Sequence, residues 1–179
     1  GQLGRPAEVR FRLPAGWQVT TALPSAGNGA YRAADYHELA DAMTFVGRYS
    51  LDSLQVDGKW IRIALWPAAD YTPAVTRNLR GGIEKMAQVQ NRLMGGAPYA
   101  VYTVFFNVIH GPVGFGGGLE HSLAQYDIMP AGAFADAAGN LGDFMYPLLS
   151  HEMFHLWNVK RIRPAEMWPY DYRAEQYTP

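Results

Sequence analysis

The sequence predicts an α+β fold with a β-rich first part and a second part in which strands alternate with helices. Residues 1 to about 66 contain short runs of alternating apolar and polar residues, separated by turn residues. In residues 73–94 the apolar positions recur every three or four residues, which indicates one long amphipathic helix. The run 99–109, rich in β-branched and aromatic residues, is typical of a central strand that is covered on both faces.

The β-rich part is expected to contain several short strands and one helical turn. Asp35 is a potential N-cap for a turn of helix over residues 35–39, and His37 within it is interpreted as a turn residue rather than a ligand. The dipeptide Asp57-Gly58 predicts a tight hairpin turn. Residues 24–29 have the composition of a loop, and the predicted strands are 8–13, 17–23, 30–33, 43–50 and 59–66.

The long helix carries Gly81-Gly82 in its middle, where each glycine costs about 1 kcal/mol relative to alanine. The pair therefore predicts a kink or a close packing contact at that point. Gly95-Gly96 is expected to end the helix.

Residues 151–155 read His-Glu-Met-Phe-His, an HExxH motif. On a helix, His151 and His155 lie one turn apart on one face, so both imidazoles can bind one metal ion with Glu152 beside it. Catalytic zinc usually has three protein ligands and a water whose pKa falls to about 7, and a glutamate can accept the proton of that water. The motif predicts peptide-bond hydrolysis. Its apolar flanks favour a buried catalytic helix over a solvated helix with an accidental match.

A second stretch, residues 111–121, reads GPVGFGGGLEH and precedes a strand predicted over 119–128. It is not a phosphate-binding loop, because no Gly-Lys-Ser/Thr follows and the spacing of the glycines is wrong. Successive glycines allow another part of the chain to approach closely. From the residues alone, Glu120 is either a site residue on a strand or an exposed carboxylate in a flexible turn.

Composition narrows the class of protein. The chain has 179 residues, of which 49% are hydrophobic, and a formal net charge of −1, which gives no case for binding nucleic acid or an anionic membrane surface. It has no cysteine, so any zinc must be held by histidine and carboxylate. The longest apolar run, 99–109, is too short to span a bilayer. Gly1 in place of methionine suggests a cut or processed chain, and the compartment stays open.

Two stretches together resemble one family. Gly-Gly-Leu-Glu-His at 117–121 and the run HEMFHLWNVKRIRP at 151–164 closely resemble the glycyl aminopeptidase family of zinc metallopeptidases, and the blocks 35–41 and 170–178 are similar to it as well. The resemblance implies that residues 1–66 are the end of an N-terminal β domain. It also implies that residues 67–179 are the first, incomplete part of a thermolysin-like catalytic domain, without the PDZ domain of the family.

The resemblance also implies a role for each site residue. His151 and His155 would bind zinc, and Glu152 would be the general base. A strand would line the cleft and pair with a peptide substrate by β-addition, with its glutamate holding the free α-amine; this strand is Gly117, Gly118, Leu119 and Glu120. His121 would be a neighbour that orients Glu120.

The third zinc ligand is the point where the resemblance and the spacing differ. Spacing offers Glu175, twenty residues after His155. The resemblance instead places the ligand in a Trp-x-x-Glu-Gly segment beyond Thr178-Pro179, so the zinc site of this chain is expected to be empty, weakly occupied or completed by solvent or a neighbouring molecule. Lys160, Arg161 and Arg163 are expected to favour a helix C-terminus through the macrodipole.

The predicted function of the parent protein is that of a zinc aminopeptidase that releases small N-terminal residues, glycine or alanine, while this chain alone has little or no activity. One alternative is a non-catalytic peptide-binding or structural remnant, and another is a zinc endopeptidase. Because part of the domain is missing by this interpretation, apolar surface around Met153, Phe154 and Trp157 is expected to be exposed and to promote self-association.

Overall fold

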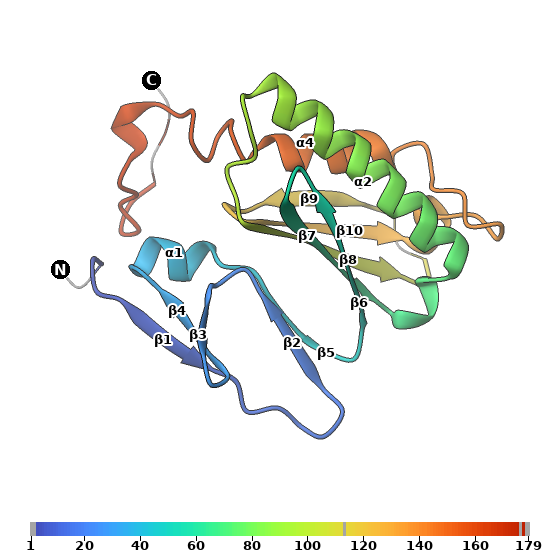
Figure 1. Cartoon of the computed structure of the whole chain (residues 1–179), viewed down its shortest axis with the longest axis horizontal. Coiled ribbons are helices and arrows are strands. Elements are labelled where there is room, and N and C mark those ends of the chain that lie inside the picture. Colours follow the sequence, from blue (N-terminus) through green and yellow to red (C-terminus); the bar gives the residue numbers. More distant parts are fainter. Residues whose placement is uncertain (1–2, 113, 176, 178–179) are drawn as a thin grey trace.

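A computed structural model describes residues 3–112, 114–175 and 177. Its largest unit is a five-stranded sheet with helices on one face. Two smaller sheets are formed by the N-terminal part of the chain (Figure 1). The predicted α+β class is confirmed, with the β-rich part first. Among the described residues, no helix combines the length and apolarity needed to cross a bilayer.

The two smaller sheets come from the first 47 residues. One sheet has the strand order β1-β4-β3, and the other pairs β2 with β5. Residues 24–29 were predicted to be a loop, but Ser25–Gly27 within them form strand β3, which pairs antiparallel with β4. The bounds are β1 Ala7–Arg10, β2 Gln18–Thr21, β3 Ser25–Gly27, β4 Ala30–Ala33 and β5 Thr44–Gly47.

Helix α1 (Tyr36–Asp41) follows β4. Asp35 caps it as predicted, since its side chain accepts a hydrogen bond from the Glu38 backbone N–H at 2.8 Å. The last residue of the helix is Asp41. Its side chain contacts the C-terminal half of the chain, at Ser122 and Lys160.

The large sheet has the order β6-β7-β8-β10-β9. Strands β7, β8 and β10 are parallel to one another, while β6 and β9 pair antiparallel with β7 and β10 at the two edges. The predicted turn at Asp57-Gly58 joins β6 to β7 with φ values of 50° and 74°, as a tight hairpin requires. The bounds are β6 Ser50–Val56, β7 Lys59–Trp66, β8 Val101–Ile109, β9 Gly117–Glu120 and β10 Ala124–Pro130.

The sheet does not divide at residue 66. Strands β6 and β7, which the sequence places before that boundary, belong to the same sheet as β8. Because two parallel strands need a crossover between them, β7, α2 and β8 form one β-α-β unit. The change of sheet falls between Gly47 and Ser50, and the limits of the two domains stay a prediction.

Helices α2 (Pro73–Leu93) and α4 (Met145–Phe154) cover one face of the large sheet (Figure 1). The main hydrophobic core lies between them and the sheet. Gly82 of α2 is in close packing contact with α4, because the Tyr146 ring occupies the space that a side chain at Gly82 would need. This confirms the packing reason predicted for the glycine pair. The remaining short elements are α3 Ala131–Phe134, η1 Ala68–Asp70 and η2 Ala165–Met167.

The opposite face of the sheet packs against the N-terminal half. A small core there contains Tyr49, Ala64 and Phe105, and the rings of Phe45 and Phe105 meet edge to face with centroids 5.5 Å apart. Strand β8 is therefore central and covered on both faces, as predicted.

Two predictions in the second half are wrong. Residues 119–128 do not form one strand, because the chain reverses at Ser122 and Leu123 and returns as β10. The expected apolar patch is also not exposed: Met153 is 1% and Trp157 is 6% exposed, since both pack into the core beside α4, and Phe154 is half-buried. The stated reason for self-association is thereby removed.

Candidate active site

Helix α4 carries the HExxH motif. Its buried side chains, among them Leu148, Leu149 and Met153, anchor it in the core. His151 lies in the last turn of the helix and His155 is the C-cap residue, so both rings lie on the same side. Their Nε2 atoms are 3.2 Å apart and the ring planes are perpendicular.

The spacing of the two imidazoles fits a shared metal ion. Zinc–nitrogen bonds of about 2.0–2.1 Å at a tetrahedral angle place two ligand nitrogens about 3.3 Å apart. The Nδ1 atom of His155 lies 2.7 Å from the Asn158 carbonyl oxygen, which can only accept, so Nδ1 carries the proton. The neutral ring therefore presents the lone pair of Nε2 toward His151. A lone pair at that distance from a second ring nitrogen needs a proton or a cation between them.

Glu152 is buried between α4 and strand β9, with 5% of its surface exposed. Its carboxyl group fills the space that a side chain at Gly118 would need, so the glycine permits this close approach. Burial raises the pKa of the Glu152 carboxyl and the charge of Glu120 raises it further, while His151 and His155 oppose these effects. A raised pKa makes this carboxylate a stronger base near neutral pH.

Strand β9 is an edge strand, so only one side of its backbone is paired, with β10. Glu120 at its end comes close to the motif: ligand atoms of Glu120, Glu152 and His155 all lie within 4.8 Å of one another. Among the described residues, this is the one group of three such side chains, and His151 is not a member of it. The Leu119 side chain is exposed.

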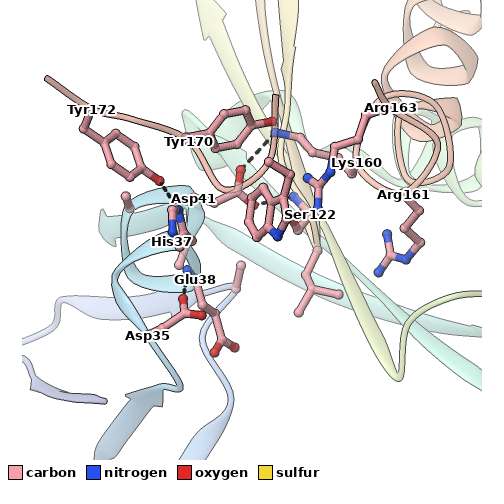
Figure 2. A pocket seen from close by; sticks show the side chains of 15 residues that line it. Asp35, His37, Glu38, Asp41, Ser122, Lys160, Arg161, Arg163, Tyr170 and Tyr172 are labelled. Atoms are coloured by element: carbon pink, nitrogen blue, oxygen red, sulfur yellow. Dashed lines mark hydrogen bonds and ion pairs between the residues drawn. The ribbon is translucent and has the colours of Figure 1, made fainter. Parts of the chain in front are cut away.

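Asp41 of α1 joins the N-terminal half to the site (Figure 2). It accepts hydrogen bonds from the Ser122 backbone N–H at 2.6 Å and from Lys160 Nζ at 3.0 Å, and Lys160 Nζ lies 4.0 Å from Glu120 Oε1. Burial alone would raise the pKa of Asp41, but the nearby His121 ring, the hydrogen bond from Ser122 and the charge of Lys160 hold it well below its usual range. Asp41 therefore ties the β9–β10 turn to Lys160.

Four basic residues near the site do not have the roles that were predicted for them. His121 is directed at Asp41, with Nδ1 3.7 Å from Oδ1, rather than at Glu120. Arg161 donates to the carbonyls of Leu156 at 2.5 Å and Pro98 at 3.0 Å. The macrodipole interpretation of Lys160, Arg161 and Arg163 is wrong, because α4 ends at Phe154 and the effect falls off within the last turn.

A cavity of about 460 Å³ is lined in part by Asp41 and Lys160, and neither His151 nor His155 lines it. The rings of His37 of α1 and Trp168 meet at a tilt of 45° with centroids 4.8 Å apart. His37 Nδ1 lies 2.9 Å from the Tyr172 hydroxyl (Figure 2). Arg163 lies over the Trp168 ring at 3.7 Å. The two outlying blocks of the family resemblance, 35–41 and 170–178, therefore pack against each other in their described residues; Thr178 and Pro179 lie outside these.

Among the described residues, no group of three potential ligand side chains contains both His151 and His155. Glu175 is exposed and is hydrogen-bonded to the Tyr177 hydroxyl, and it is not part of the group of ligand atoms around His155. The histidines therefore fit zinc as two of its ligands, and Glu175 is not placed to be the third.

Sequence reasoning gave no role to Asp41 or Asp127. Asp41 lies in a block noted for its resemblance, but its partners are 81 and 119 residues away in the chain. Asp127 had a local signal, since a carboxylate in the middle of an apolar strand is rare.

Comparisons with known proteins find two matching family models and several similar solved structures. The model of the M61 glycyl aminopeptidase family matches residues 145–179, and that of the M61 N-terminal domain matches residues 1–48. The crystal structure of an aminopeptidase N family protein from Idiomarina loihiensis is 27% identical with a TM-score of 0.85, covering 99% of this chain and 31% of that one. An M1 zinc metallopeptidase from Deinococcus radiodurans is 18% identical with a TM-score of 0.46, covering 85% of this chain and 33% of that one.

No curated protein matches the chain. The chain spans about a third of the length of the two solved structures, 31% and 33%.

Proposed function

We propose, for this member of the M61 glycyl aminopeptidase family, that the chain carries the zinc-binding helix and the substrate strand of a zinc-dependent aminopeptidase. The observation that supports this most directly is the convergence of the α4 histidine pair with two carboxylates, Glu152 and Glu120, one of which lies on a free sheet edge.

Each residue of the site has a distinct chemical task in this proposal. His151 and His155 would hold a zinc ion through Nε2, and the Asn158 carbonyl keeps the His155 ring in the tautomer that this needs. The ion would supply an acidic water when bound. The Glu152 carboxylate would be the general base that accepts a proton there, and burial raises its pKa.

Glu120 accounts for the choice of an aminopeptidase over an endopeptidase. A carboxylate beside the metal helix can pair with the ammonium group at the N-terminus of a peptide, whereas an internal peptide bond offers no such charge. The free edge of β9 can add the peptide backbone as a further strand, which brings its N-terminus to Glu120 at the strand end. The preference for glycine or alanine is taken from the family.

The test is hydrolysis of glycyl and alanyl arylamides by the zinc-loaded, full-length parent protein. Glu152→Gln and a chelator should each lower kcat by a factor of about 10²–10⁴. Glu84→Gln, on the exposed face of α2, is the matched control and should change nothing. Activity that survives both the chelator and Glu152→Gln would remove the proposal.

Glu120→Gln separates the two kinds of peptidase. It should raise KM for substrates with a free N-terminus by about tenfold, because one charge-assisted hydrogen bond is lost. N-acetylated peptides should be poor substrates of the wild type, and efficient cleavage of such blocked peptides would favour an endopeptidase.

A non-catalytic peptide-binding function is the second candidate. It is favoured because no group of three potential ligand side chains among the described residues contains both His151 and His155. It predicts no bound zinc and no hydrolysis. Equal, weak binding of free and N-blocked peptides to the metal-free protein would favour this candidate over the enzyme.

A further inference from the structure

A row of hydrogen-bonded polar side chains lies inside the large sheet, on the face that α4 covers. The Tyr102 hydroxyl of β8 donates to Gln125 Oε1 at 3.1 Å, and Gln125 Nε2 donates to Asp127 Oδ2 at 2.8 Å. All three side chains have no exposed surface. Every donor in the row points from Tyr102 toward Asp127, so the row ends at that carboxyl group.

The row ends next to the general base. Asp127 on β10 is the cross-strand partner of Gly118 on β9, and such partners hold their side-chain positions about 4.5–5.5 Å apart. Because the Glu152 carboxyl fills the side-chain position of Gly118, Asp127 and Glu152 are neighbours on one face of the hairpin.

The state of the Asp127 carboxyl follows from its surroundings. Its second oxygen, Oδ1, is buried and has no hydrogen-bond partner among the described residues. Burial raises the pKa of Asp127 well above its usual range, the charge of Glu152 raises it further, and the hydrogen bond from Gln125 opposes this. The titratable groups whose charges act on Asp127 or Tyr102 include Glu152 on α4, Glu120 on β9 and Tyr99. His151 and His155 act in turn on Glu152 and lower its pKa.

We propose that Asp127 is a positioning residue for the reaction: burial keeps its carboxyl group as the neutral acid, the hydrogen bond from Gln125 fixes Oδ2 as the acceptor, and the proton on Oδ1 is donated to the Glu152 carboxylate and fixes its orientation. The inference rests on the proposed role of Glu152 as general base. A buried acid that only fills space would need neither the directed row nor an oxygen left for a further bond.

Two substitutions distinguish positioning from packing. Asp127→Asn keeps the size of the side chain, an acceptor for Gln125 and a permanent donor toward Glu152, so it imitates the neutral acid. Asp127→Leu fills the volume but removes the donor. Thr103→Val is the matched control, because Thr103 is a buried polar residue of the adjacent strand β8 and, one residue from Tyr102, faces the other side of the sheet.

The first measurement needs no enzymatic activity. Infrared difference spectra of the chain, with carbon-13 in the aspartate carboxyl groups, should show one protonated carboxyl band at pH 7 that is lost in Asp127→Asn. The carboxyl carbon signal of Glu152 in NMR spectra should move in Asp127→Leu and stay close to wild type in Asp127→Asn and Thr103→Val. An ionised Asp127 at pH 7, or an unmoved Glu152 signal in Asp127→Leu, overturns the proposal.

The second measurement is steady-state hydrolysis of a glycyl arylamide by the zinc-loaded protein. Asp127→Leu should lower kcat by about tenfold or more with little change in KM, as loss of a supporting hydrogen bond commonly does. Asp127→Asn and Thr103→Val should keep kcat within a factor of about three. Equal loss in Asn and Leu variants assigns a structural role and overturns the proposal. A wild-type parent protein without activity refutes the proposed function, and the spectroscopic results then decide about Asp127 separately.

Discussion

Gly118 shows how a single residue sets the distance between the sheet and the candidate general base. A methyl group at this position would overlap the buried Glu152 side chain, whereas the neighbouring Gly117 has open space around it. Gly118→Ala should therefore displace Glu152 and lower the free energy of unfolding by about 1–3 kcal/mol. Gly117→Ala is the matched control and should be neutral or slightly stabilising.

Urea unfolding measures the stability of both glycine variants, and hydrolysis by the zinc-loaded protein measures the displacement of Glu152. If both variants behave alike, the close approach at Gly118 does not exist.

Asp41 predicts a pH dependence of stability. Its pKa is lower in the folded state than the ordinary value of 3.8, so its charge stabilises the fold above that value, and the contribution is lost as the pH falls toward the folded pKa. Asp41→Asn should lower the free energy of unfolding by roughly 1–2 kcal/mol at pH 7. The difference from wild type should shrink below about pH 4.

Urea unfolding of wild type and Asp41→Asn across this pH range is the measurement, with Glu84→Gln as the control that should show no such trend. A difference that stays constant down to pH 2 would contradict the assignment of Asp41 as the charged partner of Lys160 and Ser122.

At the scale of elements, the contact between α2 and α4 explains Gly82 but not Gly81. Gly81 has open space where a side chain would be, while Gly82 touches the Tyr146 ring of α4. Gly81→Ala should raise the free energy of unfolding by about 0.5–1 kcal/mol, because alanine loses less backbone entropy in a helix. Gly82→Ala should lose this gain, because the ring must move.

A double-mutant cycle tests the contact. Combining Gly82→Ala with Tyr146→Ala should restore the gain of alanine at that position, and additive effects would show that the two residues do not touch. The stability of each variant is read from thermal or urea unfolding.

At the scale of the whole molecule, the ligand set predicts weak metal binding by this chain. Two neutral imidazoles leave the charge of zinc uncompensated, and Glu175 lies away from them. In calorimetric titrations with Zn²⁺, His151→Ala or His155→Ala should abolish the weak binding, whereas Glu175→Gln should leave it unchanged. A loss of affinity by more than about tenfold in Glu175→Gln would restore Glu175 as a ligand.

The sequence by itself determined the features that depend on neighbours in the chain. The apolar period of residues 73–94 predicted helix α2, Asp57-Gly58 predicted the turn between β6 and β7, and the spacing of His151 and His155 predicted that their rings meet. These features are set by backbone geometry over a few residues, which residue type and spacing encode directly.

Only the tertiary structure decided which residues from distant parts of the chain lie next to the site. The reversal at Ser122 and Leu123, the pairing of Asp41 with Lys160 and the position of Asp127 beside Glu152 could not be predicted. Each depends on how strands and helices far apart in the chain pack together, and burial then sets which carboxyl groups are charged. Local propensity predicts neither the packing of distant elements nor the charge of buried carboxyl groups, because both are properties of the packed interior.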